Sequence, residues 1–295
     1  MMSELTNYAK IVISQYGIKG DKSFEYLGVN IDSTMTYKIY RKTSENVMQY
    51  LTSTEPYCDI LNFLPPDFLL ENKLSICDFS KGKIGNVETY RIVFIINSRL
   101  NIKQTEKCVT DFLINIGGEK YLSDIVNTEA NIRKMLKTDK SMLMQLGIEV
   151  DEKGYLLGLK YYVGIKDKGI IPPIDTVMEL LSLATGNLHN GNEIHPIIEF
   201  LIQEEFEPIF IGANLYGDAK EVKLYFISKV FGFQTKNIVK HTLEVMQKYH
   251  LDNFISEEDV NTLYEMDLFV RGIAIDISDK NKWHLYINGL PRKVV

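Results

Sequence analysis

The chain has 295 residues and a formal net charge of −6 at pH 7, which argues against a general nucleic-acid-binding protein, because such proteins normally carry a basic excess. Its composition, 45% hydrophobic and 24% charged, is that of an ordinary globular protein with a substantial core. No apolar run approaches the roughly 20 residues of a membrane helix, and the N-terminus lacks a secretion signal. We therefore expect a cytoplasmic monomer in which a local cluster of cations holds any anionic ligand.

The cysteine and histidine spacing does not indicate a metal centre. Cys58, Cys77 and Cys108 are spaced unlike a zinc site or a disulfide framework, so we interpret them as reduced and structural. His189 and His195 flank a loop-like stretch and have no matching pattern of cysteines or carboxylates around them.

Five pairs of alternating segments are typical of β-hairpins. In chain order their strands are 27–32 with 36–42, 74–78 with 88–97, 146–151 with 155–166, 208–216 with 221–228, and 270–278 with 282–288. The second hairpin is expected to have a longer loop, which includes residues 80–87. The first strands resemble one another: Gly147-Ile148-Glu149-Val150-Asp151 and Gly212-Ala213-Asn214-Leu215-Tyr216 both begin with glycine and then alternate.

Segments with helical periodicity precede the first hairpin and separate each hairpin from the next. The predicted helices are 4–15, 44–51, 59–70, 103–116, 128–143, 174–184, 193–204, 236–249 and 256–266. Pro65 and Pro66 are expected to end or kink the helix at 59–70. No linker rich in Pro, Gly or Ser interrupts the pattern, so we predict one domain, residues 1–295, built from five similar units.

The second strands carry a repeated pattern in which a basic residue is followed two positions later by tyrosine. In the strand 221–226, Lys223 and Tyr225 share one face while Val222, Leu224 and Phe226 share the other, because strand side chains alternate. Related segments are Tyr37-Lys38-Ile39-Tyr40, Tyr90-Arg91-Ile92-Val93, Leu159-Lys160-Tyr161-Tyr162 and Trp283-His284-Leu285-Tyr286. Each of these strands therefore has one polar and one apolar face.

Ten antiparallel strands leave no exposed edge only if the sheet closes on itself. The helices must then pack on the apolar face, which places the Lys/Tyr face inside. Buried charges are costly unless water or a ligand satisfies them. We predict an α+β fold, a ten-stranded antiparallel β-barrel with a solvated lumen inside a ring of helices, and an anion site in that lumen.

This pattern resembles the ABBA, or PT-barrel, prenyltransferases, which are named for repeated α-β-β-α units around a ten-stranded barrel. The resemblance covers nearly the whole chain as architecture, and its residue-level support is the repeated basic-x-Tyr strands. Within the family, Gly147-Ile148-Glu149-Val150 followed by Leu159-Lys160-Tyr161-Tyr162-Val163-Gly164-Ile165-Lys166-Asp167 is most similar to the cyanobactin-type peptide prenyltransferases.

The resemblance implies that basic side chains bind the diphosphate of an allylic isoprenoid and that tyrosines shield the carbocation. It assigns the diphosphate to Lys38, Arg91, Lys160, Lys223 and His284, and the carbocation shield to Tyr40, Tyr162, Tyr225 and Tyr286. Val93 stands where the second repeat would have tyrosine, and His284 is a weaker cation, so these two repeats are alternatively part of the acceptor pocket. Independently of the family, a diphosphate needs several converging cations, and tyrosine faces stabilise a cation.

Transfer to an acceptor also requires a group that takes the acceptor's proton. Glu149 has the inward parity and is our candidate base, with Glu25 as an alternative in the first repeat. Asn30, Asn214 and Tyr216 are assigned to the acceptor pocket. Asp32, Asp151 and Asp276 are most simply turn residues, although one of them could hold Mg²⁺ on the diphosphate, and no resident metal site is predicted.

The leading hypothesis is a prenyltransferase that moves a dimethylallyl or longer group from its diphosphate to an aromatic or other nucleophilic acceptor, a small molecule or a peptide side chain. A non-catalytic barrel that binds an anionic lipid or metabolite in the same lumen is the alternative. A third reading is a barrel with a filled lumen and a protein-binding surface, which requires Lys38, Lys160 and Lys223 to face solvent.

Overall fold

A computed structural model describes residues 24–31, 36–42, 51, 55–84, 87–166, 169–186, 191–228, 268–277 and 283–289. For 24–31 and 36–42 it describes the backbone only. The predicted helices 4–15, 236–249 and 256–266, and all but the last residue of 44–51, lie outside the described residues.

The described strands are antiparallel and follow one another around a closed barrel, in the order β1-β10-β9-β8-β7-β6-β5-β4-β3-β2. Closure comes from the pairing of the first strand with the last, in which Val29 lies opposite Leu285. The strands are β1 Phe24–Ile31, β2 Thr36–Lys42, β3 Leu74–Ile84, β4 Val87–Ile96, β5 Leu143–Asp151, β6 Leu156–Gly164, β7 Phe206–Tyr216, β8 Ala219–Ser228, β9 Leu268–Asp276 and β10 Trp283–Gly289.

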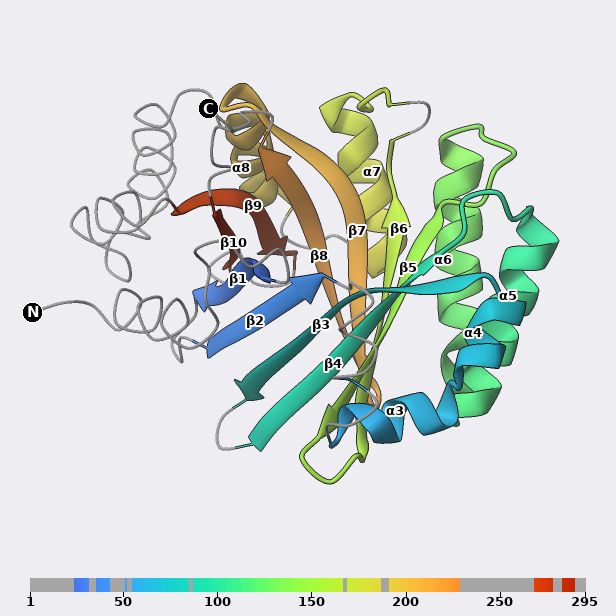
Figure 1. The fold of residues 1–295 in the computed structure, drawn as a ribbon. Helices are drawn as coiled ribbons and strands as arrows, with labels where there is room; N and C mark the ends of the chain where they lie inside the picture. Colours follow the sequence, from blue (N-terminus) through green and yellow to red (C-terminus); the bar gives the residue numbers. More distant parts are fainter. Residues whose placement is uncertain are drawn as a thin grey trace, which may run out of the picture.

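Helices occupy the connections between β2 and β3, between β4 and β5, and between β6 and β7. They are α3 Tyr57–Phe63, α4 Pro66–Glu71, α5 Ile102–Ile116, the 3₁₀ turn η1 Glu119–Tyr121, α6 Leu122–Met135, α7 Ile174–Thr185 and α8 Gly191–Gln203. Figure 1 shows α5 to α8 on the outer side of the strands. The α+β class, with antiparallel strands and helices, is confirmed. None of the helices in the described part of the chain is long and apolar enough to cross a membrane.

Local signals explain several helix boundaries. Pro66 occupies the first turn of α4, so Pro65 and Pro66 separate α3 from α4, in agreement with the predicted interruption. A capping box between Asn101 and Gln104 begins α5, and Gly117, with φ 65°, ends it in the left-handed region.

Two predicted boundaries are wrong. The helix expected at 128–143 is α6, which ends at Met135, and Leu143 already begins β5. The long loop expected at 80–87 is largely strand, because pairs such as Lys83 with Glu88 and Ile84 with Val87 continue the β3–β4 ladder almost to the turn. Cross-strand pairing therefore overrides the glycine signals of this segment.

The two faces of the strands belong to two separate apolar clusters. The larger cluster joins outward strand residues, such as Ile148 and Leu224, to helix residues, such as Phe112 and Ile198. A smaller one on the inner face contains Val93, Tyr162, Tyr225 and Ala274. The apolar face therefore packs under helices, as the alternation predicts.

Adjacent tyrosines of β6 show this alternation directly. Tyr162 belongs to the inner cluster, whereas Tyr161 is fully buried in the outer one. The Tyr161 hydroxyl donates a 2.7 Å hydrogen bond to Asp124 on α6, and the Lys220 ammonium donates a 2.6 Å hydrogen bond to the same carboxylate from β8. These contacts fix α6 against the outside of the barrel.

In each hairpin the first strand carries an extra residue at one point, and in the β5–β6 hairpin β6 carries one as well, opposite the step from Glu149 to Val150. The register shifts lie between Phe24 and Tyr26, Ile76 and Asp78, Leu143 and Gln145, and Pro208 and Phe210, and in β9 between Val270 and Gly272. Such bulges increase the local twist and bend the strand, which helps a sheet to curve into a barrel.

The packing of helices on the outer face predicts a large difference between two isoleucine-to-alanine substitutions. Ile132 on α6 is 0% exposed, whereas Ile114 on α5 is 56% exposed. We expect Ile132→Ala to lower the free energy of unfolding by about 2–5 kcal/mol, because it leaves a cavity. Urea unfolding monitored by circular dichroism measures both variants. Ile114→Ala is the matched control and should change stability little, so equal losses would contradict the packing described.

Candidate active site on the inner wall

Polar side chains line the inner face and are nearly inaccessible to solvent. Arg91, Glu149, Lys160, Asn214, Asp276 and His284 are 3%, 5%, 8%, 6%, 1% and 5% exposed. This corrects the expected solvated lumen, because at these positions the wall is enclosed and the polar groups lie close to one another. The third reading is also wrong for Lys160, which is buried rather than directed to solvent.

A cluster of aromatic rings occupies one part of this wall. The Tyr162 and Tyr225 ring centroids are 5.3 Å apart, and those of Tyr225 and Tyr286 are 6.2 Å apart. The His284 ring lies 4.5 Å from that of Tyr286, edge to face, so His284 belongs to this cluster. Three of the four tyrosines predicted to shield a cation are thus brought together by β6, β8 and β10.

Lys160 places its ammonium group against two of these rings. Its Nζ lies 5.2 Å from the Tyr162 centroid and 5.3 Å from the Tyr225 centroid. A cation within about 6 Å of an aromatic face is attracted by the negative face of the ring. The inner wall therefore contains a place where a positive charge is held between two tyrosines.

Gly212 makes room for this arrangement. A Cβ atom built on Gly212 would lie 2.7 Å from Tyr225 Cε2 and 3.1 Å from Tyr162 Cδ1, so a side chain here would collide with both rings. Gly147, at the same point of its hairpin, lies opposite Lys160 in the register. The glycine shared by the first strands could have predicted this site from the sequence, because it marks a position where an inward side chain of a neighbouring strand needs space.

A second group of inner-face residues extends across β4, β5, β6 and β7, with polar side chains on β4, β5 and β7 and a glycine on β6. Arg91 lies opposite Glu149, which lies opposite Gly158. The Tyr216 hydroxyl donates a 3.0 Å hydrogen bond to Glu149 Oε2. Burial, and then the negative charge of Glu149, raise the pKa of Tyr216 far above its usual range, so the phenol stays protonated.

Two further carboxylates lie on the inner face; from the sequence, Glu221 has no expected role, and Asp276 is expected to be a turn residue or a Mg²⁺ ligand. Glu221 on β8 accepts a 3.3 Å hydrogen bond from Asn214 Nδ2. Asp276 at the end of β9 is buried and lies opposite Lys223 in the register, and the turn that follows it lies outside the described residues. The turn interpretation is confirmed for Asp151, whose Oδ1 accepts hydrogen bonds from the backbone N–H groups of Lys153 and Tyr155.

The wall therefore carries mixed charge rather than a ring of cations. On the inner face, cations such as Arg91, Lys160 and Lys223 are interspersed with carboxylates such as Glu149, Glu221 and Asp276. Lys160 and Lys223 lie on the two strands that flank Gly212, and Asp276 lies opposite Lys223 on the neighbouring strand.

The first hairpin contributes predicted positions whose side chains are not described. In the register, Asn30 lies opposite His284, Lys38 opposite Gly82, and Tyr40 opposite Ser80. Ser80 itself lies opposite Arg91 on the neighbouring strand. These positions therefore share the inner-face register of the site.

No group of three His, Cys, Asp or Glu residues in the described ranges lies close enough to hold a metal ion. His195 is half-buried on α8, and His189 lies outside the described residues. The inner carboxylates have other neighbours: Glu149 binds Tyr216, and Glu221 binds Asn214. The residues that the structure describes therefore do not fit a resident metal centre.

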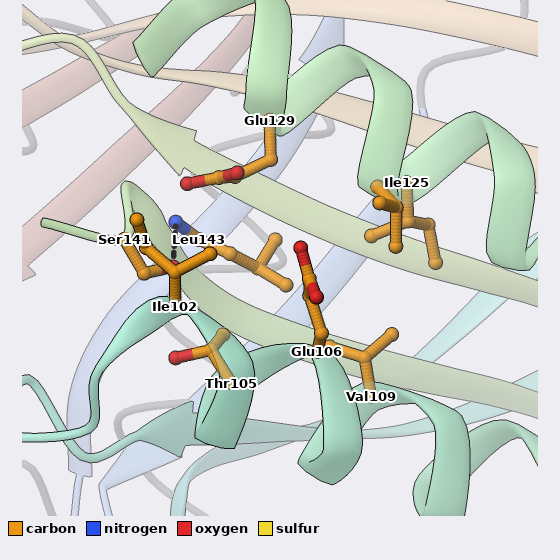
Figure 2. Close-up of a pocket in the computed structure, with 9 residues that line it drawn as sticks. Ile102, Thr105, Glu106, Val109, Ile125, Glu129, Ser141 and Leu143 are labelled. Atoms are coloured by element: carbon orange, nitrogen blue, oxygen red, sulfur yellow. Dashed lines mark hydrogen bonds between the residues drawn. The ribbon is translucent and has the colours of Figure 1, made fainter. Parts of the chain in front are cut away.

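A small pocket outside the barrel is a separate feature. It lies between α5, α6 and the start of β5, with Glu106, Glu129 and Leu143 among its lining residues (Figure 2). The Glu129 carboxylate accepts a 2.9 Å hydrogen bond from the Met142 backbone N–H and pairs with Arg133. Glu129 thus holds α6 against the beginning of β5, and we do not assign this pocket to the active site.

Comparisons with known proteins show similarity in structure but not in sequence. No family model matches the chain, and no curated protein matches it in sequence. Its fold is similar to that of AnaPT from Neosartorya fischeri, an ABBA prenyltransferase, with a TM-score of 0.61 and 12% identity, covering 93% of this chain and 80% of AnaPT. At this identity the similarity shows the fold alone.

The buried phenol of Tyr216 predicts a particular alkaline behaviour. A tyrosine in an unfolded chain ionises near pH 10, while Tyr216 in the folded protein ionises at a higher pH. Its contribution to stability is therefore complete below about pH 10 and is lost as the pH rises further. Tyr216→Phe should reduce the fall in stability above pH 10 by up to about 1.4 kcal/mol per pH unit.

Urea unfolding at pH 9, 10 and 11 measures this slope. Tyr155 is 68% exposed, so Tyr155→Phe is the matched control and should leave the slope unchanged. The same slope in wild type and Tyr216→Phe would contradict the burial of this phenol.

Proposed function

We propose that this chain, taken as a single domain of five α-β-β-α repeats, is a prenyltransferase of the ABBA type. The fold similarity to AnaPT supports this proposal. The observation that carries it is the position of Lys160 Nζ, 5.2 Å and 5.3 Å from the ring centroids of Tyr162 and Tyr225. The same tyrosine faces can stabilise an allylic cation, while the lysine itself attracts the diphosphate that leaves.

In this proposal the diphosphate binds beside Lys160 and Lys223, over the space that Gly212 leaves open. Arg91, Lys38 and His284 complete the set of basic residues around the wall. Because carboxylates share the wall with the cations, we place the diphosphate in the part nearest these two lysines. Charge-assisted hydrogen bonds from lysine to phosphate oxygens provide the binding free energy.

The reaction breaks the bond between the allylic carbon and the diphosphate oxygen, and the diphosphate leaves with the electron pair. The allylic cation forms against Tyr162, Tyr225, Tyr286 and Tyr40, whose rings also keep water away. A nucleophilic atom of the acceptor forms the new bond to carbon, and Glu149 takes the acceptor's proton. If Mg²⁺ takes part, it accompanies the diphosphate and neutralises part of its charge.

In this proposal the acceptor binds on the same inner face, near Glu149, Tyr216, Asn214 and Asn30. We infer an aromatic or other nucleophilic acceptor, a small molecule or a peptide side chain. We keep the peptide class because the β5 and β6 sequences led us to expect a cyanobactin-type enzyme. The donor carries a dimethylallyl or longer group.

Removal of the lysine charges tests the donor site. We expect Lys160→Met and Lys223→Met each to weaken the binding of dimethylallyl S-thiolodiphosphate roughly 10- to 150-fold, because each loses a charge-assisted hydrogen bond. The double variant should show no measurable binding. Isothermal titration calorimetry measures the dissociation constants.

Lys153 lies in the exposed turn between β5 and β6, so Lys153→Met is the matched control. Unchanged affinity in Lys160→Met and Lys223→Met would sink the donor-site assignment. Tight binding by the wild type without release of inorganic diphosphate, in the presence of any acceptor, would favour the non-catalytic carrier.

The tyrosines should affect the rate rather than donor binding. Tyr162→Leu or Tyr225→Leu removes one cation–π contact of about 0.5–2 kcal/mol, which corresponds to a fall in kcat of about 2- to 30-fold. Diphosphate release from dimethylallyl diphosphate measures kcat, and the thiolodiphosphate affinity should stay within twofold of wild type. Tyr155→Leu is the control. An equal loss of kcat in this exposed variant would show that the effect does not come from the shield.

A further inference from the structure

The contact between Tyr216 and Glu149 spans three strands. Glu149 is on β5, Gly158 is the residue opposite it on β6, and Tyr216 is at the end of β7. The Tyr216 ring passes over the backbone of β6, and its hydroxyl reaches Glu149 Oε2 at 3.0 Å. An interaction of this length across an intervening strand requires that strand to have no side chain at the crossing point.

Gly158 meets that requirement. A Cβ atom on Gly158 would lie 2.4 Å from Tyr216 Cδ1 and 2.5 Å from Cε1, distances at which the ring must move. The glycine at position 158 and the tyrosine at position 216 are therefore parts of one arrangement. Its result is that a ring from β7 lies flat on β6 and its hydroxyl points at one carboxylate.

We propose that Tyr216 is a positioning residue, which holds the Glu149 carboxylate in the orientation that accepts the acceptor's proton, through the space left open by Gly158. This inference rests on the proposed function, because it takes Glu149 to be the proton acceptor. A carboxylate has two oxygens and several acceptor positions, so a hydrogen bond at Oε2 leaves capacity for another.

The charges around Glu149 are consistent with this role. Arg91 lies opposite Glu149 on β4 and Tyr216 reaches it from β7, while Lys160 is two residues from Gly158 on β6 and Glu221 is on β8. Burial raises the pKa of the Tyr216 phenol, so it remains protonated and a hydrogen-bond donor at neutral pH. Such a donor favours the ionised carboxylate, which is the form that can take a proton.

The test uses Tyr216→Phe, Glu149→Gln, Gly158→Ala and the double variant Tyr216→Phe/Glu149→Gln. Tyr216→Phe keeps the ring over Gly158 and removes only the hydroxyl, so folding is retained. The rate is measured with dimethylallyl diphosphate and two acceptor probes, N-acetyl-L-tyrosinamide and N-acetyl-L-tryptophanamide. The second measurement is the titration of carboxyl resonances by ¹³C NMR in protein labelled at glutamate Cδ, with the Glu149 resonance identified by its loss in Glu149→Gln.

We expect Tyr216→Phe to lower kcat about tenfold, the effect of one lost hydrogen bond to a charged group, with donor affinity within twofold of wild type. The acid limb of the pH–rate profile and the midpoint of the Glu149 resonance should both move to higher pH. Gly158→Ala should behave similarly, because it displaces the ring. In the Glu149→Gln background the loss of the hydroxyl should have no further effect on kcat, whereas a merely structural role would leave the two losses additive.

An unchanged Glu149 titration in Tyr216→Phe, or additive losses in the double variant, overturns the positioning role even if the wild-type enzyme is active. Failure of the wild type to bind dimethylallyl S-thiolodiphosphate overturns the proposed function, and with it the role of Tyr216 in proton transfer. In that case the NMR titration still reports whether the phenol acts on the carboxylate. The two failures are thus distinguishable.

Discussion

The structure depends on one constraint: in a closed ring of antiparallel strands, alternate side chains must point into a common interior. Helices cover the outer face wherever they are described, so the inner face is the only place for the basic and tyrosine residues of the second strands. Lys160, Tyr162 and Tyr225 meet there because β6 and β8 lie on either side of β7. No local interaction within one hairpin could bring these three side chains together.

Enclosure then determines how the polar groups are stabilised. Burial of a charge is tolerated when opposite charges and hydrogen bonds surround it. On the inner wall, acidic residues lie opposite basic ones in the strand register, such as Asp276 opposite Lys223 and Glu149 opposite Arg91. Two groups of contacts lie on this wall: Lys160 against the rings of Tyr162 and Tyr225, and Tyr216 hydrogen-bonded to Glu149.

Glycines on the intervening strands make room for the side chains of both groups. Gly212 makes room for the rings of Tyr162 and Tyr225, and Gly158 makes room for the ring of Tyr216. Each lies on the strand between two side chains that must approach one another. A barrel with larger residues at these positions would have the same topology but could not assemble either group in this form.

The sequence by itself determined the hairpin order, the α+β class and the face to which Lys160, Tyr162, Lys223 and Tyr225 belong, because strand alternation is a local property with a period of two residues. Only the tertiary structure decided that Asp276 lies opposite Lys223, that Tyr216 binds Glu149 across Gly158, and that the wall is enclosed. These facts depend on the register between strands far apart in the chain. A bulge changes that register by one residue, and nothing in the local pattern revealed where the bulges lie.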